Sequence, residues 1–147
     1  MNTKRFILAF IVIFVLLEIF SYLVHSVILS STYMSEGIKQ IFRPMDQMNS
    51  YMWVIWVTDL IWSYLFVFFF VKGYENKGIL EGLRYGFYMG IFFAFVSSYQ
   101  SFAIYPLPYA LTLQWFIYGL VEMLILGFMA ALLYKPKKAV ATEPSAA

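Results

Sequence analysis

The chain has 147 residues, of which 63% are hydrophobic and only 12% are charged, and its formal net charge is +2. Soluble domains are about half apolar and a quarter charged, so this composition excludes an ordinary soluble domain. The small net charge gives no reason to expect nucleic-acid binding. The absence of cysteine excludes disulfides, thiolate nucleophiles and thiolate-held metals. Together these features predict a small polytopic membrane protein.

Four apolar stretches are long enough to cross a bilayer core, which takes roughly 20 helical residues. Because backbone groups cannot stay unpaired in lipid, we expect four transmembrane helices in an all-α, antiparallel up-and-down bundle. The first stretch contains Glu18 and is too long for a cleaved signal peptide, so we expect it to be retained. The predicted spans are residues 6–29, 51–71, 79–104 and 109–134.

These spans predict one transmembrane domain over residues 1–138, followed by a disordered cytoplasmic tail over residues 139–147. Eight of the ten basic residues lie near the two termini or around the connection between the second and third spans. The other side of the bundle carries only Lys39 and Arg43. Because basic residues favour the cytoplasmic side, both termini are predicted to be cytoplasmic.

The longest connection, residues 30–50, lies on the predicted outer side. Its apolar residues recur at helical spacing, Ser35 is placed to begin a helix, and Pro44 is placed to end one. This pattern favours a short interfacial helix, and an irregular lid over the outer end of the bundle is the alternative. The residues with this spacing are Ile38, Ile41, Phe42 and Met45.

Small residues recur along the third span at intervals of four: Gly78, Gly82, Gly86 and Gly90. Such spacing makes a flat ridge on which another helix can pack closely. The ridge is compatible with packing inside one protomer and with a homo-oligomer interface.

Three carboxylates, Glu18, Asp59 and Glu122, stand inside predicted spans, where ionisable groups are costly and usually face the bundle interior. Further polar groups share one helical face with Glu18 in the first span and one face with Glu122 in the fourth span. The outer half of every span carries polar residues, whereas the inner half is almost wholly apolar. This asymmetry predicts a polar pocket open to the outside and closed on the inside by apolar side chains. The candidate ligand or proton-site residues are Glu18, Tyr22, His25, Asp59, Gln114, Tyr118 and Glu122.

Each of these residues also has a purely structural interpretation. The carboxyls are compatible with interhelical hydrogen bonding in the neutral form as well as with ligand or proton binding. His25 is compatible with an ion pair to Asp59, with an interhelical hydrogen bond, or with metal ligation. Met45 and Met48 near His25 form a weak copper candidate, and methionine is equally a filler of irregular apolar gaps. No cofactor is predicted.

Several segments resemble those of small four-helix bacterial inner-membrane proteins that have no established activity. They are residues 25–33, the pair Arg43–Pro44 and above all residues 78–135. In the last of these regions, the run from Lys77 to Gly86, the turn at residues 105–108 and residues 115–127 carry the similarity. The resemblance implies a bacterial inner membrane and four spans, and nothing about substrate. Small multidrug exporters also carry a carboxylate midway along their first helix, as Glu18 does here. The long outer loop and the carboxylates of the second and fourth spans depart from that pattern.

No catalytic motif is present, so we do not expect an enzyme. One hypothesis is a non-enzymatic binding or accessory protein for a membrane lipid, a small amphiphile or a membrane partner. The alternative is a proton-coupled small-molecule transporter that works as a homo-oligomer through Glu18 or Glu122. Membership of a larger membrane complex remains open in both.

Overall fold

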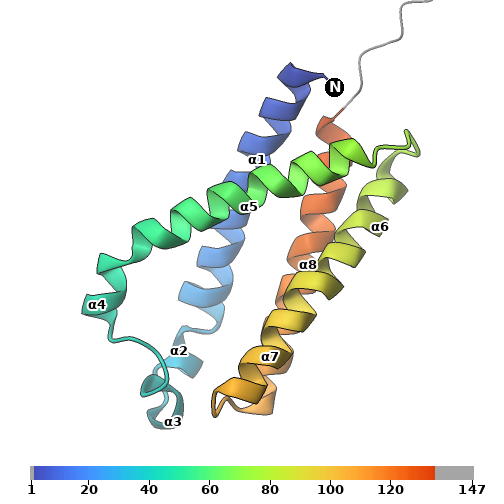
Figure 1. Ribbon diagram of the computed structural model, residues 1–147. Coiled ribbons are helices and arrows are strands. Elements are labelled where there is room, and N and C mark those ends of the chain that lie inside the picture. Colours follow the sequence, from blue (N-terminus) through green and yellow to red (C-terminus); the bar gives the residue numbers. More distant parts are fainter. Residues whose placement is uncertain (1, 135–147) are drawn as a thin grey trace, which may run out of the picture.

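The computed structural model describes residues 2–134, and all regular structure within them is helical. Four helical runs are long and apolar enough to cross a membrane, and they pack antiparallel (Figure 1). The predicted four-helix architecture is therefore confirmed. The runs are α1 with the π-helix η1 (Thr3–Ser21, Tyr22–Ile28), α5 (Met52–Lys72), α6 with the π-helix η2 and α7 (Ile79–Gly90, Ile91–Phe95, Val96–Ile104), and α8 (Tyr109–Leu133).

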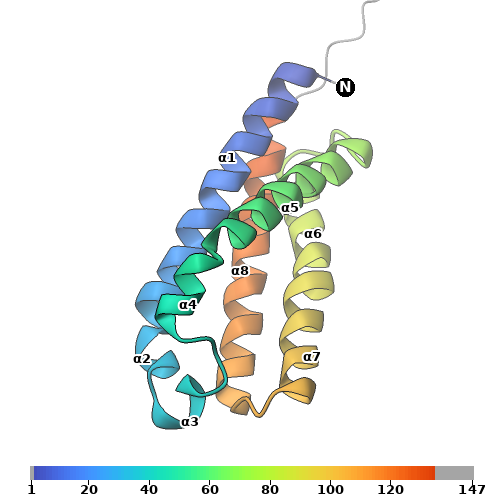
Figure 2. The same cartoon turned by 60° about the vertical axis from the view of Figure 1, so that its left-hand side comes forward.

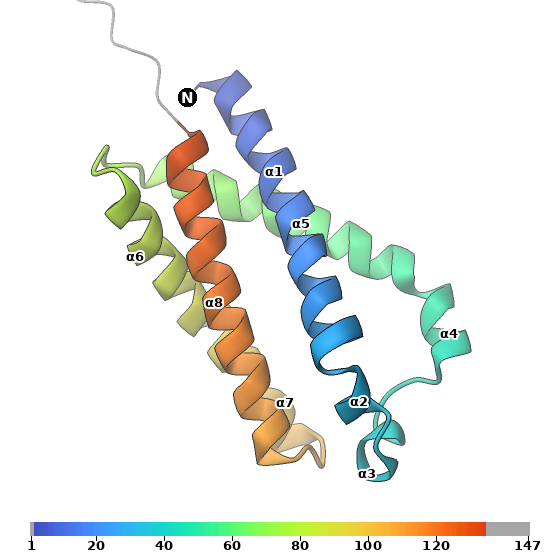
Figure 3. The same cartoon turned by 180° about the vertical axis from the view of Figure 1, so that it is seen from behind.

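The bundle has two ends that differ in construction. Its terminal end holds the start of α1, the end of α8 and the connection at residues 73–78, whereas its loop end holds residues 29–51 and the turn at residues 105–108 (Figure 1). Helix α5 crosses α1 diagonally, while the run from α6 to α7 lies along α8 (Figure 3). The tail predicted for residues 139–147 lies outside the described residues.

Three short helices occupy the loop end, where the sequence favoured one. They are α2 (Ser30–Tyr33), α3 (Glu36–Lys39) and α4 (Met45–Ser50). Ser35 does stand before α3, but its hydroxyl donates to the Thr32 carbonyl instead of accepting from the helix. Pro44 begins α4 rather than ending α3, since proline's fixed φ suits a helix start.

Residues 29–44, here called the lid, fold over the loop end of the bundle (Figure 2). Leu29 and Ile38 are buried against Leu107 of the turn at residues 105–108 and Leu111 of α8. Met45, predicted on the same apolar face as Ile38, is instead 57% exposed because it already belongs to α4. The structure therefore combines the two predicted alternatives, since the lid contains short helices and also caps the bundle.

Helices α6 and α8 meet along a seam of small residues. A Cβ atom on Gly82 would lie 2.6 Å from the Ala131 Cβ, and one on Gly86 would lie 2.9 Å from the Leu124 Cα. A Cβ on Gly90 would lie 2.6 Å from a methyl of Leu120. Of the two roles predicted for this ridge, packing within the protomer is the one these three glycines perform.

Gly78 does not belong to this seam, which corrects the sequence prediction for that residue. No atom lies within 4 Å of its added Cβ, and its backbone adopts φ 75°, a conformation that favours glycine. The connection that it closes is fastened by Glu81, whose carboxylate accepts from the backbone N–H groups of Glu75 (2.5 Å) and Lys77 (2.7 Å). Gly78 therefore shapes the turn that leads into α6.

The main apolar core lies in the terminal-end half. Phe6, Ile13 and Val67 are almost fully buried within it, and Tyr85 of α6 donates a 2.6 Å hydrogen bond to the Phe66 carbonyl of α5. The predicted apolar closure of this half of the bundle is thus confirmed. The opposite half is where the helices separate and a cavity opens.

Candidate functional site

A cavity of about 340 Å³ lies between the four long helices in the loop-end half. Helix α5, which runs diagonally to the other helices (Figure 1), contributes Asp59 to the lining, and α8 supplies the largest share. Polar and apolar side chains alternate around it. The lining residues are Leu17, Ser21, Val24, His25, Asp59, Phe93, Ala94, Ser97, Ser98, Trp115, Tyr118, Gly119, Glu122 and Met123.

Four of the predicted site residues line this cavity, namely His25, Asp59, Tyr118 and Glu122, and they come from three of the four runs. Gln114 lies on α8 outside the lining, and so does Glu18 on α1. The structure thus brings these four residues together in the half of the bundle where the sequence predicts a polar pocket.

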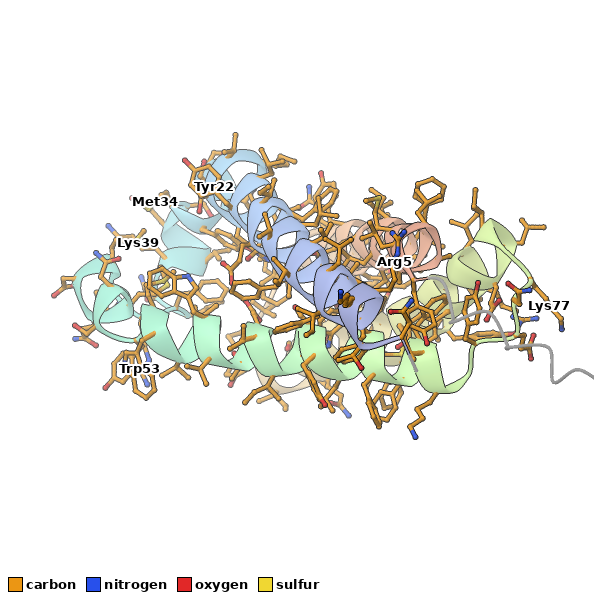
Figure 4. The ribbon with its side chains drawn as sticks, turned by 90° about the horizontal axis from the view of Figure 1, so that it is seen from above. Arg5, Tyr22, Met34, Lys39, Trp53 and Lys77 are labelled. Carbon is orange, nitrogen blue, oxygen red and sulfur yellow. The ribbon has the colours of Figure 1, made fainter. Side chains whose placement is uncertain are left out.

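Tyr22 does not share a face with His25, contrary to the helical spacing predicted from the sequence. It is 64% exposed and projects from the outer surface of the bundle (Figure 4). The reason is the π-helix η1, which begins at Tyr22 and widens each turn, so that an interval of three no longer returns to the same face. His25, in the same π-helix, lines the cavity.

The three membrane-depth carboxyls form one electrostatic group. Asp59 of α5 interacts with both Glu18 of α1 and Glu122 of α8. One oxygen each of Glu18 and Glu122 is buried and accepts no hydrogen bond from any described residue. Neither lysine nor arginine is present in the cavity lining. Within residues 2–134, the chain therefore supplies acceptors here without matching cationic donors.

A hydrogen-bond chain connects the cavity wall to the lid. The indole N–H of Trp115 donates to the Tyr33 hydroxyl at 2.7 Å, and that hydroxyl lies 2.6 Å from the His25 Nδ1. Because indole can only donate, the Tyr33 proton is free to be given to His25.

Tyr33 occupies the centre of an aromatic cluster beneath the lid. Its ring lies 5.3 Å from that of Phe42 and 6.5 Å from that of Trp115. Burial raises the pKa of the Tyr33 hydroxyl to about 12, although the hydrogen bond from Trp115 acts in the opposite direction. Tyr33 therefore stays neutral and able to donate at ordinary pH.

The loop-end part of α5 has little contact with the rest of the protomer. Every residue from Trp53 to Thr58 is exposed, and Trp53 projects away from the bundle (Figure 4). Asp59 begins the part of the helix that turns towards the cavity, and Ser63, one turn later, is fully buried. Asp59 thus stands between an exposed segment of α5 and the buried part of the same helix.

The described residues contain no cluster of three or more His, Cys, Asp or Glu side chains arranged to hold a metal ion. Met45 and Met48, the weak copper candidates, lie on α4 and line neither the cavity nor its lid. His25 lies in η1 and directs Nδ1 to Tyr33. The arrangement thus brings no Met–His copper set together at the cavity.

Sequence reasoning identified the carboxyls but missed how the site is closed. Neither Tyr33 nor Trp115 was among the predicted site residues, because sequence alone cannot separate an aromatic at the membrane boundary from one in a pocket wall. The available signal was weak: Tyr33 and Phe42 are aromatics in a connection that otherwise reads as a polar loop. Their partner Trp115 lies 82 residues beyond Tyr33 in the chain.

The fold and the cavity define a small four-helix protein with four candidate membrane spans. Comparisons with protein-family models, with curated proteins and with solved structures find no match to this chain. The similarity to small inner-membrane proteins is therefore supported only as far as the four-helix architecture extends. The site itself must carry any argument about function.

Proposed function

We propose that this protein is a non-enzymatic binding or accessory protein that holds the polar head of a small amphiphile in the cavity between its four helices. The observation that carries the proposal is the buried carboxyl oxygen of Glu122, a residue that lines the cavity, which accepts no hydrogen bond from the described chain. A buried acceptor without a donor is costly, and a bound head group with N–H or O–H donors removes that cost.

The shape and chemistry of the cavity favour an amine or polyhydroxyl head on an apolar body. Its volume of about 340 Å³ falls within the range of small-molecule sites, and Phe93 and Trp115 offer aromatic surface beside Glu122. With the carboxyls of Asp59 and Glu122 and neither lysine nor arginine in the lining, the cavity disfavours an anionic head group. An ammonium would gain both a charge partner and an aromatic face.

Membrane placement follows from the sequence and completes the proposal. The four candidate spans fit a multi-pass protein, and the distribution of basic residues favours cytoplasmic termini. A bacterial inner membrane is part of the proposal on the resemblance of several segments to small inner-membrane proteins. A homo-oligomer or a larger membrane complex is part of this proposal, because residues 53–58 of α5 present an exposed helix surface. Native mass spectrometry after gentle extraction tests that part directly.

Binding of a fluorescent long-chain alkylamine to the protein in lipid nanodiscs tests the function. We expect saturable binding that Glu122→Gln weakens at least tenfold, while Glu36→Gln, an exposed carboxylate on the lid, leaves it unchanged. An alkyl sulfate of equal chain length should bind poorly. Equal binding of amine and sulfate, or equal effects of the two variants, would reject the proposal.

Proton-coupled transport by a homo-oligomer is the second candidate, favoured by the electrostatic link between Asp59 and both Glu18 and Glu122. Carboxyls that share one field exchange protons and cationic ligands competitively. Flux of the same alkylamine into acid-loaded proteoliposomes tests it. Transport requires flux that Glu18→Gln abolishes while the variant still folds, whereas a binding protein gives no flux.

A further inference from the structure

A second cavity, of about 330 Å³, lies under the edge of the lid, outside the site described above. Its walls come from the lid, from the end of α7 and from the turn at residues 105–108. Trp115 is the one residue that lines both cavities. Because the Trp115 N–H is already donated to Tyr33, this side chain offers the second cavity only its ring.

Arg43 is the charged group of this second cavity. Its guanidinium lies over the Tyr51 ring, 4.4 Å from the ring centre. None of the ion pairs among residues 2–134 involves Arg43, although Asp46 stands only three residues further along. Stacking engages the flat face of a guanidinium and leaves its N–H groups free around the edge. Arg43 is therefore held in place and still has its anion-binding donors available.

The remaining walls divide into a polar and an apolar part. Ser101 and Tyr105 bring hydroxyl groups from α7 and the turn, while Ile41 and Leu107 bring apolar surface. The cavity therefore joins one cation and two hydroxyls to a hydrocarbon surface. A phosphate group uses such a combination well, because its oxygens accept a forked pair of hydrogen bonds from arginine and further bonds from hydroxyls.

The surface next to the cavity indicates that the phosphate belongs to a lipid. Phe102 and Ile104, at the end of α7 beside Ser101 and Tyr105, are 41% and 72% exposed. Both lie in the last turn of α7, where the third candidate span ends, so they place exposed apolar surface directly beside the cavity at the end of that span. The loop end of the spans is also the level at which lipid head groups meet the protein. A soluble anion would gain nothing from this apolar surface.

From this juxtaposition we propose that the cavity beneath the lid is a binding site for a phospholipid phosphate, with Arg43 as its anion ligand and Ser101 and Tyr105 as additional donors. The site is distinct from the carboxyl-lined cavity, which disfavours an anion. The two sites, which share Trp115 in their walls, thus select opposite head-group charges. Bound lipid in the second site would also brace the lid against α7.

The test is native mass spectrometry of the detergent-solubilised full chain titrated with phosphatidylglycerol, and separately with diacylglycerol of identical chains. We expect phosphatidylglycerol to form a discrete one-lipid adduct and diacylglycerol to form far less. Arg43→Gln should weaken the adduct about tenfold, as expected for losing one charge-assisted hydrogen-bonding group. Lys39→Gln, which removes the other lid cation outside this cavity, is the matched control and should leave the adduct unchanged.

Two further arms keep the outcome decisive. Arg43→Lys retains the positive charge but loses the paired N–H donors of the guanidinium, so this variant should bind phosphatidylglycerol with intermediate affinity. That result would show that the loss of binding in Arg43→Gln is not a folding failure. Excess inorganic phosphate should not displace the lipid. Equal losses in the Lys39 and Arg43 variants, equal binding of diacylglycerol, or displacement by free phosphate would each overturn the proposal. None of these results depends on alkylamine binding in the first cavity, so the two proposals fail separately.

Discussion

In the terminal-end half, α6 and α8 touch backbone to backbone across Gly82, Gly86 and Gly127, and the neighbouring core is almost fully buried. In the loop-end half, α5 diverges, a cavity opens, and aromatic rings and a lid take over the closure. The same four helices are therefore rigid at one end and adaptable at the other. Membrane helices gain little from burying apolar surface against each other, so close backbone contact decides which end is rigid.

Gly86→Ala should break the rigid half and give the largest effect on stability. The new Cβ meets backbone atoms of Met123 and Leu124, which cannot move aside as a flexible side chain would. We expect a loss of about 3 kcal/mol or more, despite the better helix propensity of alanine. Thermal unfolding in detergent measures it. Gly37→Ala, where nothing lies within 4 Å of the new Cβ, serves as the control. Equal losses of stability in the two variants would contradict the close packing of α6 against α8.

Glu81→Ala should release the connection at the terminal end. The Glu81 side chain is buried, and its carboxylate is the acceptor for the backbone N–H groups of Glu75 and Lys77. Leaving two such donors without a partner should cost about 2–3 kcal/mol. Denaturant titration of the variant gives the value. If hydrogen exchange at residues 75–77 stays as slow as in the parent, the carboxylate does not hold this turn.

Tyr33→Phe should affect the adaptable half alone. The variant removes the acceptor for Trp115 and the partner of His25, at a cost of about 1–2 kcal/mol confined to the lid. Hydrogen exchange should accelerate in residues 29–44 and remain unchanged along α6 and α8. Uniform acceleration through the whole bundle would show that the two halves are not energetically separate.

The Tyr33 hydroxyl also gives the lid a dependence on alkaline pH. Its folded pKa of about 12 lies above its ordinary value of 10.0, so folding favours the protonated form. The stabilisation is complete below pH 10 and declines as the pH rises from about 10 towards about 12. Lid exchange, corrected for the intrinsic base-catalysed rate, should therefore accelerate over this range in the parent protein and not in Tyr33→Phe.

The smallest expected effect comes from the surface carboxylate Glu75. Hydrogen bonds and charge from Lys77 and Arg84 lower the pKa of this carboxyl from 4.5 to about 2. Its contribution is therefore present above pH 4.5 and is lost as the pH falls towards about 2. Because these ion pairs are exposed, Glu75→Gln should change the acid sensitivity of unfolding only slightly. An acid-unfolding curve that shifts as far as that of Glu81→Ala would overturn this ranking.

The candidate site was predictable in composition but not in geometry. Glu122, Asp59 and His25 stood out because charged or titratable groups are rare within apolar spans, and all three line the cavity. Tyr22 was placed wrongly because its assignment assumed a regular α-helix, and a π-helix cannot be foreseen from residue spacing. Gly78 was similarly assigned from its interval, although its backbone φ gives it a different role.

The sequence by itself determined the four helices, their antiparallel order and the division into an apolar and a polar half, because composition and span length act locally along the chain. Only the tertiary structure decided which residues meet. The bond from Trp115 to Tyr33, the diagonal course of α5 and the sharing of the Trp115 ring by two cavities join segments far apart in the chain. Such contacts depend on the angles at which helices cross and on where a helix widens into a π-helix. Neither can be predicted from a local sequence pattern.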